Sequence, residues 1–244
     1  MTPSTHTYEI PIRWRDLDFL EHVTNVVYTE FATDALAVMR SEGMLRPELS
    51  PVAMHVDYVR PVDLDHEMVR VVSTLGDGVV EQEMLTAGAE GEQIAARVRT
   101  ELGSPGRFER AWGRGGMATS HVVRPSDIGP DRQIPPSGVF TFFQEARARL
   151  QRLAEVPEPS RHTVVVHSAC WFGEPLVWTP DPYTVRTWVE AVGSSSVTFA
   201  GELGDAHAVY ARSRAVVAGF DRELGSSRPL TAGERGRIQA YVSR

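Results

Sequence analysis

The sequence lacks several features that mark large classes of protein. It contains one cysteine, Cys170, so an internal disulfide is excluded and a reducing compartment is expected. No window approaches the 18 or so consecutive apolar residues that a membrane-spanning helix needs. The first residues form neither the basic region nor the apolar run of a secretory signal. We therefore expect a cytoplasmic protein that is not bound to a membrane.

Positive charge is also scarce. Against 32 acidic residues there are 25 basic ones, all of them arginine, which gives a formal net charge of −7. Nucleic acids and anionic membranes are bound by basic surfaces, so we expect neither as a partner. The chain has no glycine-rich phosphate loop and no Gly-x-Ser-x-Gly nucleophile motif. No pair of histidines has a spacing that suits a metal site.

What is present is typical of a globular protein. Hydrophobic residues make up 42% and charged residues 23% of the chain, enough to bury a core. A length of 244 residues fits one large domain or two of about half that size.

The most informative stretch runs from Ile12 to Asn25. A short strand-like start leads into a polar turn that gathers Asp16, Asp18, Glu21 and His22. Thr24 or Asn25 then stands where a helix N-cap is expected. Apolar residues follow at helical spacing, at Tyr28, Phe31, Ala32, Ala35, Leu36 and Met39. Carboxylates and an imidazole are thus placed at the positive end of a helix, where backbone N–H groups bind anions or polarise a carbonyl.

Asp16-Leu-Asp18, His22-Val23, Asn25 and Tyr28 resemble the signature D-x-D-x-x-G-H-V-N-N-x-x-Y. This is the signature of the 4-hydroxybenzoyl-CoA thioesterase-like hotdog family. The match has two departures, because Glu21 replaces the family glycine and Thr24 replaces its first asparagine.

The resemblance implies an acyl-CoA or acyl-carrier-protein thioesterase that needs no metal or redox cofactor. It makes Asp18 the catalytic base or nucleophile and His22 an auxiliary that orients water or contacts the thioester oxygen. The backbone N–H at Asn25 would be the oxyanion donor. It also implies the hotdog fold, a long helix wrapped by a curved antiparallel sheet, with the ligand's pantetheine arm between paired units.

Strand patterns after the helix fit this α+β class. In the first half they lie at 52–59, 68–75, 79–86 and 93–102, and in the second half at 163–172, 183–192, 196–203 and 207–220. Between the halves, residues 104–119 are rich in glycine and have no periodicity, which predicts a linker. We therefore expect one domain over 1–103 and another over 120–244.

The second half repeats the plan of the first. Arg124-Pro-Ser-Asp127 lies 111 residues after Arg13-Trp-Arg-Asp16, and the same offset predicts a second amphipathic helix over 137–154. The resemblance implies that this chain is a tandem of two hotdog units, a double hotdog that forms an intrachain pseudo-dimer. Whether two such chains pair again as a homodimer stays open.

The second copy of the motif has lost most of its chemistry. The counterparts of Asp16, Asp18, His22, Asn25 and Tyr28 are Asp127, Gly129, Gln133, Pro136 and Val139. Because an aspartate is retained at both first positions, Asp16 is assigned a structural role in the turn. Asp131 lies close enough in sequence to replace the missing carboxylate, but we expect one working site per chain, in the first half.

Several residues have alternative roles. Asp18 could only cap the turn, and His22 could only fill it. Glu21 adds a second carboxylate or blocks the site, and Thr24 caps the helix. Tyr28 forms core, acyl-pocket wall or both, and Arg60 is a candidate for the phosphates of the ligand.

Arg13 and Arg15 are further phosphate candidates. Two rival functions remain open at this point. One is an acyl-thioester binding protein without turnover, and the other is a different hotdog chemistry such as dehydration or polyketide processing.

Overall fold

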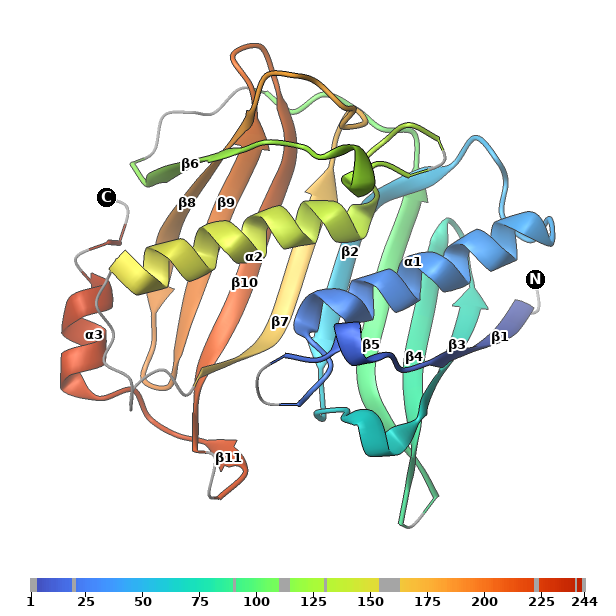
Figure 1. Cartoon of the computed structure of the whole chain (residues 1–244), viewed down its shortest axis with the longest axis horizontal. Coiled ribbons are helices and arrows are strands. Elements are labelled where there is room, and N and C mark those ends of the chain that lie inside the picture. Colours follow the sequence, from blue (N-terminus) through green and yellow to red (C-terminus); the bar gives the residue numbers. More distant parts are fainter. Residues whose placement is uncertain are drawn as a thin grey trace. The chain divides into compact units, whose positions relative to one another are not determined.

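The computed structural model describes residues 4–18, 21–89, 91–109, 115–129, 131–153, 163–221, 224–239 and 241–242. The chain divides into two units, Met1–Pro105 (unit 1) and Gly106–Arg244 (unit 2). In each unit a long helix lies across one face of an antiparallel sheet (Figure 1). The α+β class expected from the sequence is thus confirmed for each unit.

Unit 1 is built on a sheet whose strands run in the order β1-β3-β4-β5-β2, every neighbouring pair being antiparallel. Its strands are β1 (Ser4–Pro11), β2 (Ser50–Tyr58), β3 (Met68–Leu75), β4 (Val79–Gly88) and β5 (Gly91–Gly103). The helix α1 (Asn25–Ser41) follows the short 3-10 turn η1 (Trp14–Asp16), and a second turn, η2 (Leu64–His66), precedes β3.

The apolar stripe of α1 faces the core, as the helical spacing predicts. All six predicted stripe residues are buried, and Ala32, Ala35 and Met39 have no exposed surface. The strands supply the opposite wall through alternate residues, as a sheet with one buried face requires. A polar side chain also crosses this interior, because Gln82 Nε2 donates to the carbonyl of Ala32 (3.2 Å) and to Ser73 Oγ (3.2 Å).

Unit 2 has the corresponding strand order, β6-β8-β9-β10-β7, again antiparallel. Its strands are β6 (Met117–His121), β7 (Thr163–Phe172), β8 (Tyr183–Val192), β9 (Ser196–Gly204) and β10 (Val209–Asp221), with a short β11 (Ser226–Ser227) beside β10. Its helices are α2 (Pro136–Leu153) and α3 (Ala232–Gln239), and η3 (Pro125–Asp127) precedes α2.

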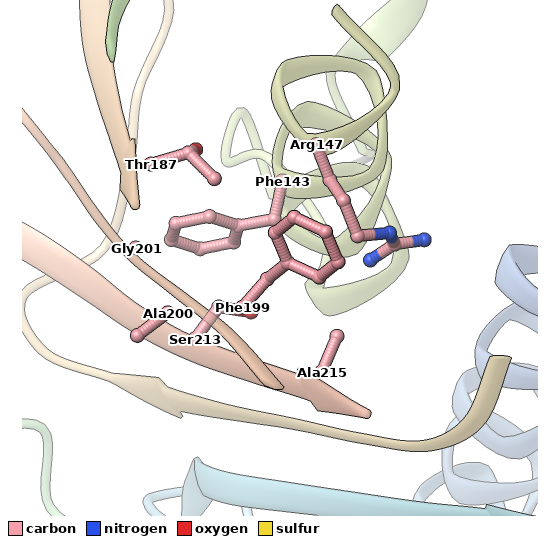
Figure 2. A pocket seen from close by; sticks show the side chains of 8 residues that line it. All are labelled: Phe143, Arg147, Thr187, Phe199, Ala200, Gly201, Ser213 and Ala215. Carbon is pink, nitrogen blue, oxygen red and sulfur yellow. The ribbon is translucent and has the colours of Figure 1, made fainter. Parts of the chain in front are cut away.

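The interior of unit 2 is filled differently. Phe143 occupies the helix position that Ala32 holds in unit 1, and Gly201 lies opposite it on β9. A Cβ on Gly201 would come within 3.0 Å of the Phe143 ring, so the glycine makes room for the aromatic side chain. A small pocket lies here, lined by Phe143 and Arg147 of α2 and by Phe199 of β9 (Figure 2). Arg147 is buried.

The segment predicted as a linker is partly structured. Residues 110–114 of it lie outside the described residues. Arg107 Nε donates to Glu174 Oε1 (2.6 Å), Phe108 bridges to Val209, and Met117 begins β6, which pairs with β8. Sequence periodicity could not show this, because a short polar strand is stabilised by its distant partner and not by a local pattern.

The last helix of the chain, α3, is preceded by a capping box. Thr231 Oγ1 accepts from the N–H of Glu234 (3.2 Å), and Glu234 accepts from the N–H of Thr231 (2.6 Å), so the two residues form a capping box at α3. Among the described residues, no helix is both long and apolar enough to cross a membrane.

Candidate active site

The motif turn of unit 1 is fixed by Asp16. This carboxylate is buried, and its Oδ2 accepts from the backbone N–H of Arg13 at 2.8 Å. Its carbonyl accepts from the N–H of Thr24 at 2.9 Å, so one residue ties the start of the turn to the start of α1. This is the structural role expected for Asp16.

Asp18 and His22 face each other across the turn. The N–H of Asp18 donates to the carbonyl of His22 (2.8 Å), and the N–H of His22 donates to Asp18 Oδ1 (3.3 Å). Both residues are half-buried. The turn closes through the N–H of Glu21, which donates to the carbonyl of Asp18 (3.0 Å). The carboxylate and the imidazole residue are therefore brought together in one short loop.

Glu21 explains the family glycine in conformational terms. Its φ is 63°, in the left-handed region that glycine adopts without strain and other residues rarely do. Its side chain is exposed. The glycine of the signature thus suits the backbone of the turn, and Glu21 keeps that backbone at a cost of about 1 kcal/mol.

The helix N-terminus beside this turn has free donors. Thr24 is the N-cap residue of α1, but its side chain makes no hydrogen bond to the first turn. The expected Thr24 cap is therefore wrong in its side-chain part. Within the described part of the chain, the N–H groups of Asn25 and Val26 have no acceptor. They can donate to an anionic oxygen there.

Two tyrosines lie beneath the helix N-terminus. Tyr28 is 3% exposed, and its ring packs edge-on against Tyr58 at 5.5 Å between centroids. Burial, with smaller contributions from neighbouring Tyr58 and Asp18, raises the pKa of Tyr28 far above its ordinary value. The hydroxyl stays protonated at neutral pH, and it lies 3.5 Å from the carbonyl of Arg60.

The candidate phosphate ligands lie at the surface. Arg60 is exposed, and its Nη1 donates to Gln93 Oε1 at 2.8 Å. Arg15 Nε lies 3.6 Å from Asp16 Oδ1. Arg13 is also exposed. All three residues are therefore exposed to solvent, and the backbone carbonyl of Arg60 lies beside the Tyr28 hydroxyl.

Sequence reasoning missed a polar pair beside His22. Asp63 forms an antiparallel bridge with His22, which places their side chains on the same side of the pairing. Asp63 Oδ1 lies 2.7 Å from His66 Nδ1. The segment is held by the N–H of Val23, which donates to the carbonyl of Val62 (2.7 Å). An Asp-x-x-His spacing after a strand was the available signal, but by itself it is too common to be informative.

The counterpart turn of unit 2 has the same backbone. Arg124 N–H donates to Asp127 Oδ2 at 2.8 Å, as in unit 1. The N–H of Gly129 donates to the carbonyl of Gln133 at 2.7 Å. Arg132 has a φ of 64°, matching that of Glu21 in unit 1. The offset of 111 residues thus relates two turns of the same shape.

The side chains of the second turn differ in kind. Gly129 has no carboxylate, and Asp131 Oδ1 accepts from the N–H of Gln133 (3.1 Å) in a local turn. Asp131 is exposed. The helix α2 begins with Pro136, which has no N–H to donate. The second turn therefore lacks both the carboxylate of Asp18 and the first donor of the helix.

A metal site is not indicated by the side-chain arrangement. In the part of the chain that the structure describes, no three His, Cys, Asp or Glu side chains are grouped closely enough to hold a metal ion. Cys170 is fully buried, and burial raises its pKa far above the ordinary value, so it behaves as a small apolar residue.

Comparison with known proteins points to one enzyme class. The family model of the acyl-ACP thioesterase C-terminal domain matches residues 2–103. A search of curated proteins gives no match.

Solved structures resemble the chain over most of its length. A protein provisionally described as an oleoyl thioesterase from Lactobacillus plantarum has a TM-score of 0.68 at 13% identity, covering 91% of this chain and 98% of its own. The 12:0-ACP thioesterase from Umbellularia californica has a TM-score of 0.62 at 12% identity, covering 92% and 97%. An acyl-ACP thioesterase from Bacteroides thetaiotaomicron has a TM-score of 0.52 at 10% identity, covering 87% and 97%. At these identities the likeness shows the fold alone.

Proposed function

We propose that the protein is an acyl thioesterase that hydrolyses an acyl thioester to a free acid and a thiol, with its active site in unit 1. The family match and the shared fold support a thioester hydrolase. One observation carries the proposal further. The residues that match the thioesterase family, 2–103, include the turn that joins Asp18 and His22 to the free N–H groups of α1.

The substrate is an acyl group on a phosphopantetheine thiol, and we favour acyl carrier protein over coenzyme A as its carrier. The description of the matching family and the names of two solved structures, from Umbellularia californica and Bacteroides thetaiotaomicron, support this choice. Arg60, Arg13 and Arg15 are the proposed contacts for the phosphate of the arm, because they are exposed cations near the turn.

In the proposed reaction Asp18 acts as a general base or as the nucleophile. As a base, it takes a proton from the water whose oxygen attacks the thioester carbonyl. The tetrahedral oxyanion accepts hydrogen bonds from the N–H groups of Asn25 and Val26. The carbon–sulfur bond then breaks, and the leaving thiolate recovers the proton from Asp18.

The other predicted residues surround this centre. We assign His22 the auxiliary role of orienting the water or contacting the thioester oxygen. Tyr28 forms part of the pocket wall, with its protonated hydroxyl as a donor. Thr24 and Glu21 are proposed to contact the substrate at the mouth of the turn.

A single working site follows from the differences in unit 2. Gly129 and Pro136 replace the carboxylate and the first N–H donor, while the turn keeps its shape. We therefore assign unit 2 a supporting role in a double hotdog, in which the two units pair as a pseudo-dimer. The same strand order in the two sheets supports a tandem origin.

The pairing has its own test. Residues 1–105 expressed alone should self-associate or aggregate, because a hotdog unit without its partner leaves apolar surface and a sheet edge exposed. A monomeric fragment that melts cooperatively would contradict the pseudo-dimer. The cytoplasmic location, with its single free cysteine, and a further pairing of two chains stay predictions.

Thiol release from acyl-carrier proteins and from acyl-CoAs of graded chain length tests the function. The wild-type chain should release thiol from at least one of them, fastest from the carrier-bound acyl group. A correctly folded protein that binds a non-hydrolysed thioester analogue but releases no thiol would favour a binding protein without turnover. Faster release from acyl-CoA would instead make coenzyme A the carrier.

A further inference from the structure

Tyr58, the last residue of β2, contacts the peptide group between Asn25 and Val26, whose N–H is one of the proposed oxyanion donors. Its hydroxyl donates to the carbonyl of Asn25 at 2.9 Å. Asn25 is the first residue of α1, so this hydrogen bond joins the end of a sheet strand to the first turn of the helix. Nothing in the sequence pattern indicates it, because residues 33 positions apart form the bond.

The ring of Tyr58 is also held in place by the ring of Tyr28. It packs edge-on against Tyr28, with 5.5 Å between centroids, and Tyr28 is buried in the core. The Tyr28 hydroxyl lies 3.5 Å from the carbonyl of Arg60. A hydroxyl whose ring is fixed by packing loses little further rotational freedom when it binds the helix, so the contact can define a position.

Unit 2 keeps the ring and loses the hydroxyl. Tyr58 pairs with Ala96 in unit 1, and Phe172 pairs with Ala211 in unit 2, each alanine beginning an Ala-Arg-x-Arg segment. An aromatic contact with the helix is kept at the neighbouring position, because Phe172 makes an edge contact with Phe140 at 6.3 Å, while the counterpart of Tyr28 is Val139. The hydroxyl is therefore absent from the unit whose helix begins with a proline and has no first N–H.

We propose that Tyr58 is a positioning residue of the thioesterase site, holding the first turn of α1 so that its N–H groups point at the developing oxyanion. The inference rests on the proposed function. Catalytic donors must keep their geometry to within a fraction of an ångström, and an unanchored first helical turn frays. The hydroxyl of Tyr58 supplies that anchor without touching the substrate.

Tyr58→Phe and Tyr183→Phe form a matched pair for the test. The Tyr183 hydroxyl donates to the carbonyl of Val177 at 2.8 Å, and Val177 bridges to Gln133 in the second turn. Each variant therefore removes one hydroxyl-to-carbonyl hydrogen bond beside one of the two turns. Steady-state thiol release should show kcat lowered about tenfold with KM within about twofold for Tyr58→Phe, and both constants unchanged for Tyr183→Phe.

Hydrogen–deuterium exchange provides a readout that does not depend on turnover. Tyr58→Phe should speed exchange of the hydrogen-bonded amides of the first turn, at residues 27–29, and Tyr183→Phe should not. Unchanged exchange there, or equal kcat in the two variants, would overturn the role of Tyr58 alone. A wild-type protein that releases no thiol would overturn the proposed function, and with it the catalytic role of the anchor, whatever the exchange shows.

Discussion

The two turns that precede α1 and α2 have one backbone and two sets of side chains. Both are held by an aspartate that accepts from the N–H three residues earlier, and both contain a residue with φ near 63°. Only the first turn has Asp18 and a helix whose first residue has a free N–H. The shared backbone of the two turns is therefore not sufficient for the proposed active site. The side chains that differ between the two turns are the ones to test.

The largest effect is expected from giving the first turn the residue of the second. Asp18→Gly should lower kcat at least about 100-fold, the scale usual for a general base. The reciprocal Gly129→Asp should leave turnover unchanged, because α2 still begins with Pro136. Thiol release measures both. A gain of turnover in Gly129→Asp in an Asp18→Gly background would show that unit 2 had kept a usable site.

The next largest effect is expected from removing the N–H of Asn25 at the start of α1. Asn25→Pro removes one N–H at the first helical position, where proline is well tolerated, so the fold should be retained. Loss of an oxyanion donor should lower kcat about 100-fold. Asn25→Ala keeps the N–H and should stay within a few-fold of the wild type. Equal rates for the two variants would mean that this N–H does not contact the oxyanion.

The third prediction concerns the conformation that the turns share. Glu21→Gly and Arg132→Gly should each raise the free energy of unfolding by about 1 kcal/mol, since each native residue is held at positive φ. Glu21→Ala serves as a control that removes the side chain but keeps the Cβ, and it should give no such gain. Chemical denaturation measures all three variants. A loss of stability in the glycine variants would contradict the assigned strain.

The smallest effect is expected from pH. His121 holds the position in unit 2 that Ile10 holds in unit 1, and burial lowers its pKa, against the opposing influence of Glu145 at 3.6 Å. Arg149 also lowers it, and the ring of Phe142 lies beside the imidazole. Protonation is thus disfavoured in the folded state.

Stability from His121 is therefore present above its unfolded pKa of about 6.5 and is lost as the pH falls below it. His121→Leu should remove this part of the decline below about pH 6.5, as measured by denaturation at several pH values. A decline of the same size in the variant would assign it to other groups.

Much of the fold could be predicted from the sequence, because its signals are local. The stripe of α1 and the strands at 68–75, 163–172 and 183–192 are all found as expected. The outer strand β6 was missed since only its pairing with β8 stabilises it. In unit 1, the strand-like start lies earlier in the chain than its sequence pattern indicates, because β1 spans Ser4–Pro11.

The candidate site was predictable only in part. The family signature indicated Asp18, His22 and Asn25, and the structure places them around one turn. Tyr58 and Asp63 come from segments more than 30 residues away, and neither belongs to a motif. Their place beside the turn depends on strand ends and on a single bridge, which no local pattern encodes.

We propose one working site per chain, in unit 1. Titration calorimetry of the wild type with a non-hydrolysable thioether analogue of the best substrate, combined with thiol release by Asp18→Asn and by Asp127→Asn, tests it most directly. We expect one binding site per chain, with turnover abolished in Asp18→Asn and retained in Asp127→Asn. Two equivalent sites, or equal loss of turnover from the two substitutions, would contradict it.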